Sequence, residues 1–334
     1  MSALAPAHLV LHAADGSIAM ASLLAEYQKM IGGILVLFIA FRVLDRLRPK
    51  DRRMRLLRRG VATDVSYLAI TPLMNKLVEW LVLLVVVLPF ALLIYGTLEE
   101  GLVMNGFGPL SRLPTWLQAF LMLILGDFIG YWMHRWFHRG RMWRFHAVHH
   151  SSVDLDWLSS VRMHPVNDLL HKVATTAPLL LLGFAPVSLA AVLPVLALFG
   201  VLAHANLDWD WGPLRTVIVS PRFHRWHHTT EAEALDTNFA GLFPLWDLLF
   251  GTYHMPANRR PSRFGTSEPV PPTLGGQLLH PFRNTGALPG SREGGDHQSA
   301  SIRTSVAPLT FGPPRSEPRH QTSEAKATLE TLSC

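Results

Sequence analysis

The sequence predicts an all-α integral membrane protein with about four transmembrane helices, two of them forming a hairpin, and a histidine-rich helical cap on the cytoplasmic side. Three observations indicate this fold class. Apolar stretches recur between residues 27 and 203, and several approach the roughly twenty residues that cross a bilayer. Histidines gather between these stretches in three tight motifs. Beyond residue 255 the composition turns to Pro, Gly, Ser and Arg without apolar periodicity, which predicts a disordered tail.

The N-terminal half contains two predicted spans. The first runs from Tyr27 to Leu44, and the second from Leu77 to Tyr95. Residues 61–75 between them are fairly apolar, but Asp64 and Pro72 interrupt the stretch. We therefore expect residues 61–75 to form a re-entrant or interfacial piece and not a complete span.

A third span is predicted from Leu113 to Trp132, followed by a long apolar stretch from Val173 to Ala203. The break at Gly183–Pro186 predicts that this stretch folds as a helical hairpin. The predicted parts of the chain are an N-terminal segment (1–26), transmembrane helices with a basic loop (27–112), a histidine-containing catalytic domain with the hairpin (113–254) and the tail (255–334).

A dense block of basic residues follows the first span: Arg42, Arg46, Arg48, Lys50, Arg52, Arg53, Arg55, Arg58 and Arg59. Because apolar stretches flank the block, contact with anionic lipid head groups is favoured, and no nucleic-acid partner is expected. The positive-inside tendency places the block in the cytoplasm. All three histidine motifs then face the cytoplasm, in a bacterial inner membrane or an endoplasmic reticulum membrane.

The histidine motifs have the spacing of metal ligands. One reads H-x-x-x-H and two read H-x-x-H-H, so each presents imidazoles on one helix face. Neutral imidazole suits iron, zinc, copper and nickel. A catalytic zinc takes about three protein ligands, so eight histidines indicate at least two ions. These eight are His134, His138, His146, His149, His150, His224, His227 and His228.

Two further residues, Asp127 and Tyr131, lie on the same predicted helical stripe as the first motif and are assigned to the catalytic site. A carboxylate inside a span is costly in lipid and is by default a functional candidate. We predict that Asp127 hydrogen-bonds a ligand imidazole from another helix and orients it. His204 is the preferred partner and His228 the second choice.

The order of motifs over residues 110–254 is similar to that of the fatty acid hydroxylase/sterol desaturase superfamily. The matching patterns are D-x-x-x-Y-x-x-H-R-x-x-H from Asp127, H-x-x-H-H from His146, R-x-H-P from Arg162, H-x-N from His204, H-x-x-H-H from His224 and W-D-x-L-F-G-T from Trp246. The resemblance implies a membrane-embedded non-haem di-iron oxygenase. It also adds His164 and His204 to the ligand set. Asn167 departs from the pattern, because the family often has Glu there.

The resemblance implies two iron ions as cofactors, with zinc able to replace them on purification, and O2 as oxidant. The sequence has no dinucleotide motif and only one cysteine, Cys334, so the electrons are expected from an external reductase system of the ferredoxin or cytochrome b5 type. The expected substrate is a lipid, such as a sterol, fatty acyl or alkyl chain, whose C–H bond is hydroxylated or desaturated.

Two alternatives compete with this interpretation. A metal-binding or metal-transporting membrane protein would place ionisable residues along its spans, whereas the histidines here cluster at one face. A zinc hydrolase would carry a general-base carboxylate inside a motif such as HExxH, and none of the three histidine motifs contains one.

Overall fold

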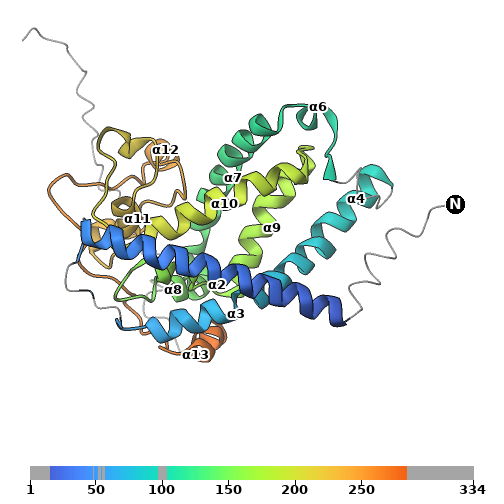
Figure 1. The fold of residues 1–334 in the computed structure, drawn as a ribbon. Coiled ribbons are helices and arrows are strands. Elements are labelled where there is room, and N and C mark those ends of the chain that lie inside the picture. The colour runs from blue at the N-terminus through green and yellow to red at the C-terminus, as the bar shows by residue number, and fades with distance from the viewer. Residues whose placement is uncertain (1–15, 48, 52–53, 55–56, 97–103, 284–334) are drawn as a thin grey trace, which may run out of the picture. The chain divides into compact units, whose positions relative to one another are not determined.

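The computed structural model describes residues 16–47, 49–51, 54, 57–96 and 104–283, and these residues form helices and loops without a β-strand (Figure 1). The predicted all-α class is confirmed. The helices are α2 (Gly16–Leu47), α3 (Val61–Val82), α4 (Leu88–Tyr95), α6 (Gly108–Ser111), α7 (Thr115–Phe137), α8 (Trp143–His150), α9 (Pro165–Leu181), α10 (Pro186–His204), α11 (Pro221–His227), α12 (Leu245–Leu249) and α13 (Leu274–Leu279). Leu83–Val87 is a π-helical turn, and 3-10 turns occupy Gly140–Met142, Trp157–Val161, Gly212–Thr216, Ala232–Ala234 and His280–Phe282.

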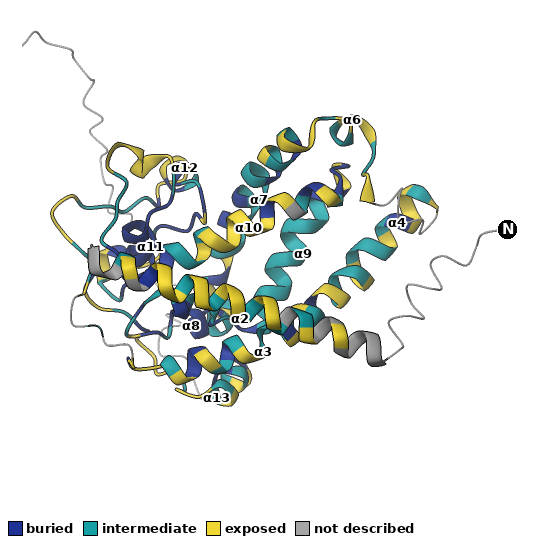
Figure 2. Cartoon of the chain, in the orientation of Figure 1, coloured by how far each residue is buried: buried dark blue, intermediate teal, exposed yellow. Residues whose placement is uncertain are grey.

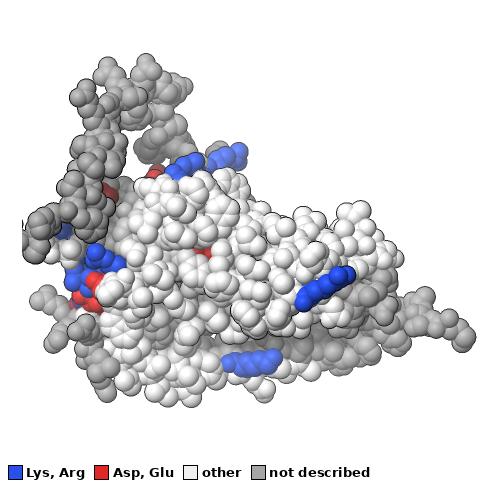
Figure 3. All heavy atoms as spheres, turned by 90° about the horizontal axis from the view of Figure 1, so that it is seen from above, with Lys and Arg blue, Asp and Glu red and all other residues white. Residues whose placement is uncertain are grey.

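Three segments are long and apolar enough to cross a membrane: Val61–Tyr95, Thr115–Phe137 and Pro186–His204. A shorter apolar segment, Tyr27–Phe41, lies within α2. Much of the face drawn in Figure 3 carries no charged side chain, and the visible Asp and Glu side chains lie toward one end. These features are those of an integral membrane protein. The number of spans and the side on which the histidines lie stay predictions.

Residues 61–75 do not form the separate re-entrant piece that the sequence predicts. They begin one helical segment that continues through the π-helical turn to Tyr95. Asp64 does not face lipid, because it is fully buried between the guanidinium groups of Arg58 and Arg162 at 2.7 and 2.6 Å. Pro72 is tolerated inside the helix and is buried there.

The predicted break is confirmed, with α9 and α10 joined by a tight turn at residues 182–185, whereas the place of this hairpin in the membrane stays a prediction. Gly183 adopts a φ of +89°, and a Cβ at this position would lie 2.3 Å from the carbonyl oxygen of Phe107. Only glycine permits this approach of two backbones. The Gln118 side chain donates to the carbonyls of Ser111 and Leu113 and accepts from the Ala185 amide. The hairpin tip is thereby attached to the start of α7.

Packing between the long helices brings the histidine motifs together. α7 contacts both α9 and α10, and α10 also contacts α11. Figure 2 shows that the buried residues concentrate around α8 and α11, whereas α2 and α4 carry many exposed ones. The first two histidine motifs lie on α7 and α8, and the third begins on α11. The polar core is therefore assembled from side chains of α7, α8 and α11, together with His204 at the end of α10.

The basic block divides into residues with different roles. Arg58 is buried and pairs with Asp64 and Asp156, so it joins α3 to the loop before Trp157 and does not reach lipid head groups. Arg59 is exposed and pairs with Asp154 at 3.2 Å. The side chains of six members lie outside the described residues: Arg42, Arg46, Arg48, Arg52, Arg53 and Arg55. Contact of those residues with lipid stays a prediction.

The predicted start of the disordered tail, residue 255, is wrong, because ordered structure continues to residue 283. Gln277 on α13 is buried, and its amide donates to Ser151 Oγ and to the carbonyl of Pro271. The carbonyl of Pro272 accepts from Thr63 Oγ1. Isolated side-chain and backbone hydrogen bonds order this segment, and such bonds leave no periodic apolar signal in the sequence. Residues 284–334 lie outside the described residues.

Truncation is expected to show that residues 274–283 stabilise the fold and that residues 284–334 do not. A chain ending after residue 283 should keep its melting temperature, whereas one ending after residue 273 should melt at a lower temperature because it loses α13 and the buried Gln277 contacts. Each lost hydrogen bond is worth about 1 kcal/mol. Thermal unfolding of the two purified chains in the same detergent measures the difference. Equal melting temperatures would show that α13 does not stabilise the fold.

Candidate metal centre

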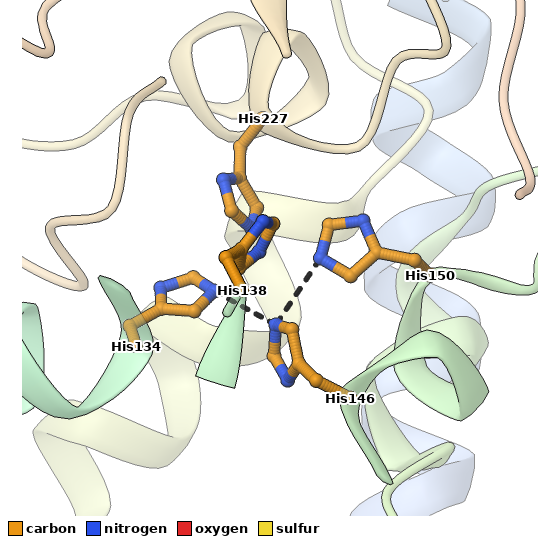
Figure 4. Close-up of side chains that lie close together, drawn as sticks. All are labelled: His134, His138, His146, His150 and His227. Carbon is orange, nitrogen blue, oxygen red and sulfur yellow. Dashed lines mark hydrogen bonds between the residues drawn. The ribbon is translucent and has the colours of Figure 1, made fainter. Parts of the chain in front are cut away.

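Nine histidines converge in two adjacent groups, within each of which the candidate ligand atoms all lie within 4.8 Å of one another. The five-histidine group contains His134, His138, His146, His150 and His227 (Figure 4), and the four-histidine group contains His149, His204, His224 and His228. The groups touch, since the rings of His150 and His228 stack with centroids 4.2 Å apart. Two histidine groups so close together could hold two neighbouring metal ions.

Hydrogen bonds donated by Nδ1 orient most of these rings. Backbone carbonyls accept from four of them: Phe239 O from His134 (2.7 Å), Arg162 O from His149 (3.0 Å), Gly200 O from His204 (2.7 Å) and Thr237 O from His227 (2.8 Å). The Asp236 carboxylate lies 3.1 Å from His138 Nδ1, and Asn167 Oδ1 lies 3.0 Å from His146 Nδ1. Such contacts determine which nitrogen carries the proton and direct the other nitrogen inward.

The Nε2 atoms that point inward are placed to bind a cation and cannot hydrogen-bond one another. A carbonyl only accepts hydrogen bonds, so His149 and His204 carry their protons on Nδ1 and present lone pairs at Nε2. These two Nε2 atoms lie 3.2 Å apart, and the Nε2 atoms of His134 and His146 lie 3.0 Å apart. Facing lone pairs repel at this distance, whereas two nitrogens on one ion, each about 2 Å from it, would sit about 3 Å apart. The donor set therefore fits metal ions.

Burial also keeps the imidazoles neutral. It lowers the pKa of His149 to about 3. Burial, together with the neighbouring imidazoles, holds the pKa of His146, His150, His224, His227 and His228 well below 6.5. Neutral imidazole is the form that binds a metal, so no proton has to be displaced near pH 7. The unpartnered, buried Nε2 atoms of His138 and His227 add further free ligand positions.

His164 does not join either group, which corrects the predicted set of ten ligands. Its Nδ1 accepts the amide N–H of Val166 at the start of α9, and its Nε2 donates to the carbonyl of Leu278 at 3.1 Å. Both ring nitrogens are therefore occupied as a helix cap and as an anchor for α13. A side chain can satisfy a free amide at a helix start in this way, and Pro165 marks that start.

Asp127 does not orient a histidine directly, so the predicted partnership with His204 or His228 is wrong. Its carboxylate accepts the backbone amides of residues 241, 242 and 243 at 3.1, 2.8 and 2.8 Å, and Trp246 Nε1 at 3.0 Å. Asp127 thus anchors the loop that precedes α12. The same loop supplies the Phe239 carbonyl to His134, so the carboxylate acts on the five-histidine group through the backbone.

Tyr131 is fully buried, and its hydroxyl is not directed at the histidines. The hydroxyl lies 2.9 Å from Thr252 Oγ1 and accepts from Arg135 at 3.0 Å, while its ring stacks on Phe250. These contacts join α7 to the end of α12. The assignment of Tyr131 to catalysis therefore has no support from its position.

Sequence reasoning missed three groups that support the histidines. Asp247 is fully buried and accepts the amides of Phe239 and Ala240, both at 2.8 Å. Asp236 contacts His138, and Asn167 contacts His146 through an amide oxygen. Asn167 therefore provides the acceptor that a carboxylate would provide, although its residue type departs from the family pattern. The W-D pair at 246–247 was the available signal for Asp247.

Asn167 offers a direct test of this support. In Asn167→Leu the buried Nδ1–H of His146 loses its acceptor, and metal affinity is expected to fall about 10–100-fold. Asn167→Asp is the matched control, since it retains an acceptor oxygen at similar volume and should bind metal nearly as well as the native chain. Competition with a metal chelator measures both affinities. Unchanged affinity in Asn167→Leu would show that this contact does not position His146.

Apolar helices that can cross a bilayer, with two adjoining groups of neutral imidazoles, are features of a membrane protein whose histidines could hold metal ions. Residues 119–252 match the model of the fatty acid hydroxylase family. This region is thus similar to the fatty acid hydroxylase family, in agreement with the resemblance that the order of the motifs indicates.

The chain is similar to several characterised proteins. It is 34% identical to ornithine lipid hydroxylase OlsE of Rhizobium tropici over 174 residues, which are 52% of this chain and 53% of that protein. It is 34% identical to alkylglycerol monooxygenase of Homo sapiens over 158 residues, 47% of this chain and 34% of that protein. Very-long-chain aldehyde decarbonylase GL1-8 of Oryza sativa subsp. indica is 30% identical over 172 residues, 49% of this chain and 62% of that protein. The aligned regions thus cover less than two thirds of each of these relatives. No solved structure matches this chain.

Proposed function

We propose that this protein is an O2-dependent di-iron enzyme that hydroxylates or desaturates a C–H bond of a membrane lipid. The main support is the pair of adjoining histidine groups, whose neutral nitrogens face one another at distances that suit a shared cation. The names of the similar proteins point to the same chemistry on lipids. An all-nitrogen donor set also suits zinc, so zinc can take these positions on purification.

The five-histidine group would hold one iron and the four-histidine group the other. Iron bound in this way supplies the activation of O2 that attack on an unactivated C–H bond requires. The protein's own contribution is to hold the imidazoles in place and to keep water away. Carbonyls such as Phe239 O and Gly200 O fix the rings, and each of the nine imidazoles contacts another one edge to face or stacked.

We propose a lipid substrate that reaches the site from the bilayer. An ornithine lipid, an alkylglycerol and a very-long-chain aldehyde, the compounds in the names of the similar proteins, all contain long hydrocarbon chains. Each turnover that reduces O2 and inserts one oxygen atom consumes two electrons. We infer an external donor of the ferredoxin or cytochrome b5 type, acting from the cytoplasm, since the single Cys334 cannot ligate an iron–sulfur cluster.

Metal content and product mass test the proposal together. The purified protein is expected to hold about two metal ions per chain and, with reductant, iron and lipid extract, to yield one lipid class with an added oxygen atom or two fewer hydrogens. Isotopically labelled O2 distinguishes hydroxylation, which retains the label, from desaturation. Two bound metals with no lipid product under any reductant would favour the metal-binding alternative. One ion or none per folded chain would refute the two-metal site.

A further inference from the structure

An apolar surface faces outward beside the five-histidine group, on the short helix α12. We define the α12 face as Leu245, Leu248, Leu249 and Phe250, whose exposed fractions are 46, 45, 62 and 38%. Four consecutive or near-consecutive large apolar side chains at this exposure are unusual for a surface in water. The α12 face lies in the cap and outside the three apolar spans.

Polar contacts on the opposite side of α12 fix this orientation. Asp247 is fully buried and accepts two backbone amides and the Thr252 hydroxyl. Trp246 donates through Nε1 to Asp127 on α7. Because these contacts hold both residues inward, the leucines must point outward. The exposed apolar face is a fixed feature of the fold.

The α12 face is continuous with the exposed surface of the membrane-spanning helix α7. The ring of Phe250 contacts Trp132 with centroids 4.8 Å apart, and Trp246 contacts Phe128 at 4.9 Å. Trp132 and Trp136 are themselves 41 and 44% exposed on the last turns of α7. Tryptophan at the end of a span is typical of the membrane interface, so α12 lies at the level where α7 leaves the bilayer.

Basic side chains border the same region. The guanidinium of Arg135 lies 5.5 Å from the ring of Trp132. Arg139 and Arg141 are exposed and follow directly after the end of α7. Arg135 donates to the buried Tyr131 hydroxyl, so Arg139 and Arg141 are the arginines placed to meet lipid phosphates. The apolar side chains match the acyl-chain layer of a membrane leaflet, and the cations match its head-group layer.

We propose that the α12 face is embedded in the lipid leaflet beside α7, at the boundary between acyl chains and head groups. The occupant is the bilayer itself. Phe239, whose amide donates to Asp247, supplies the carbonyl that orients His134. The five-histidine group is therefore attached to an element seated in the membrane, and a lipid chain could approach the site without leaving the leaflet. This placement is independent of the reaction that the metals carry out.

Site-directed spin labelling of the full chain tests the placement. The only native cysteine is Cys334, so a Cys334→Ser background allows one label at a time. The test position is Leu249→Cys, with Leu245→Cys as a second position in case the first fails to fold. Leu93→Cys, 79% exposed within the Val61–Tyr95 span, is the membrane control. Ser267→Cys, exposed next to the exposed Glu268, is the water control.

The labelled proteins are placed in nanodiscs of phosphatidylcholine and phosphatidylglycerol, and relaxation of the label is measured with O2, which concentrates in acyl chains, and with a water-soluble nickel chelate. The label at residue 249 is expected to respond more strongly to O2 than to nickel, as at residue 93. A stronger response to nickel, as at residue 267, would overturn the proposal. Shielding from both reagents would overturn it in favour of a covering protein, either a partner or a second copy of this chain.

Discussion

Replacing His149 or His227 with alanine is expected to lower the metal content from about two ions to about one per chain and to abolish turnover. Each variant removes one nitrogen from a different group, His149 from the four-histidine group and His227 from the five-histidine group. Changes to residues that merely support a ligand cost about 10–100-fold, so loss of a ligand should cost more than about 100-fold in activity. Metal analysis and lipid product formation measure the two effects on the same preparation.

His280→Ala is the matched control. His280 lies in the turn after α13 and belongs to neither histidine group, so this variant should keep two ions and native turnover. Full activity in His227→Ala would refute the assignment of the five-histidine group. A fall in metal content in His280→Ala would show that the loss in the other variants reflects general damage to the fold.

Asp127→Asn is expected to destabilise the protein and to weaken metal binding in the five-histidine group. The amide can accept through one oxygen only, and its NH2 would face the N–H groups of Phe243 and Trp246. Hydrogen bonds to a charged group are worth about 1.5–3 kcal/mol each, so losing two should cost about 3 kcal/mol or more. The loop over 239–246 would loosen, and His134 would lose its fixed acceptor. Thermal unfolding and chelator competition measure the two consequences.

The same substitution at Asp168 provides the comparison. Asp168 lies on α9 and pairs with Lys172 at 2.9 Å, with about a third of its side chain exposed, so Asp168→Asn should change stability by less than about 1 kcal/mol. If Asp127→Asn is as stable as Asp168→Asn and binds metal normally, the carboxylate does not anchor the loop. Loss of stability with unchanged metal affinity would show that the loop stabilises the fold but does not position His134.

The histidine spacing was sufficient to predict clusters of histidines that could hold metal, because ligand spacing on a helix is a local property. It was not sufficient to assign ligands to ions. His149 and His150 are adjacent in sequence and enter different groups, as do His227 and His228. Adjacent helix residues point about 100° apart, so a motif that reads as one unit is divided between two sites. Which helix faces each side of the motif depends on packing.

The errors at Asp127, His164 and residues 255–283 have one physical origin. Asp127 binds amides more than a hundred residues later in the chain, at 241–243, and the ring of His164 contacts the carbonyl of Leu278. Hydrogen bonds of this kind join residues distant in sequence and follow no periodicity. Composition, apolar length and ligand spacing are local, so the chain itself determined the helical class, the turn between α9 and α10 and the histidine clusters that could hold metal. The partners of each polar side chain were decided by helix packing, because a donor and an acceptor must first be brought within about 3 Å.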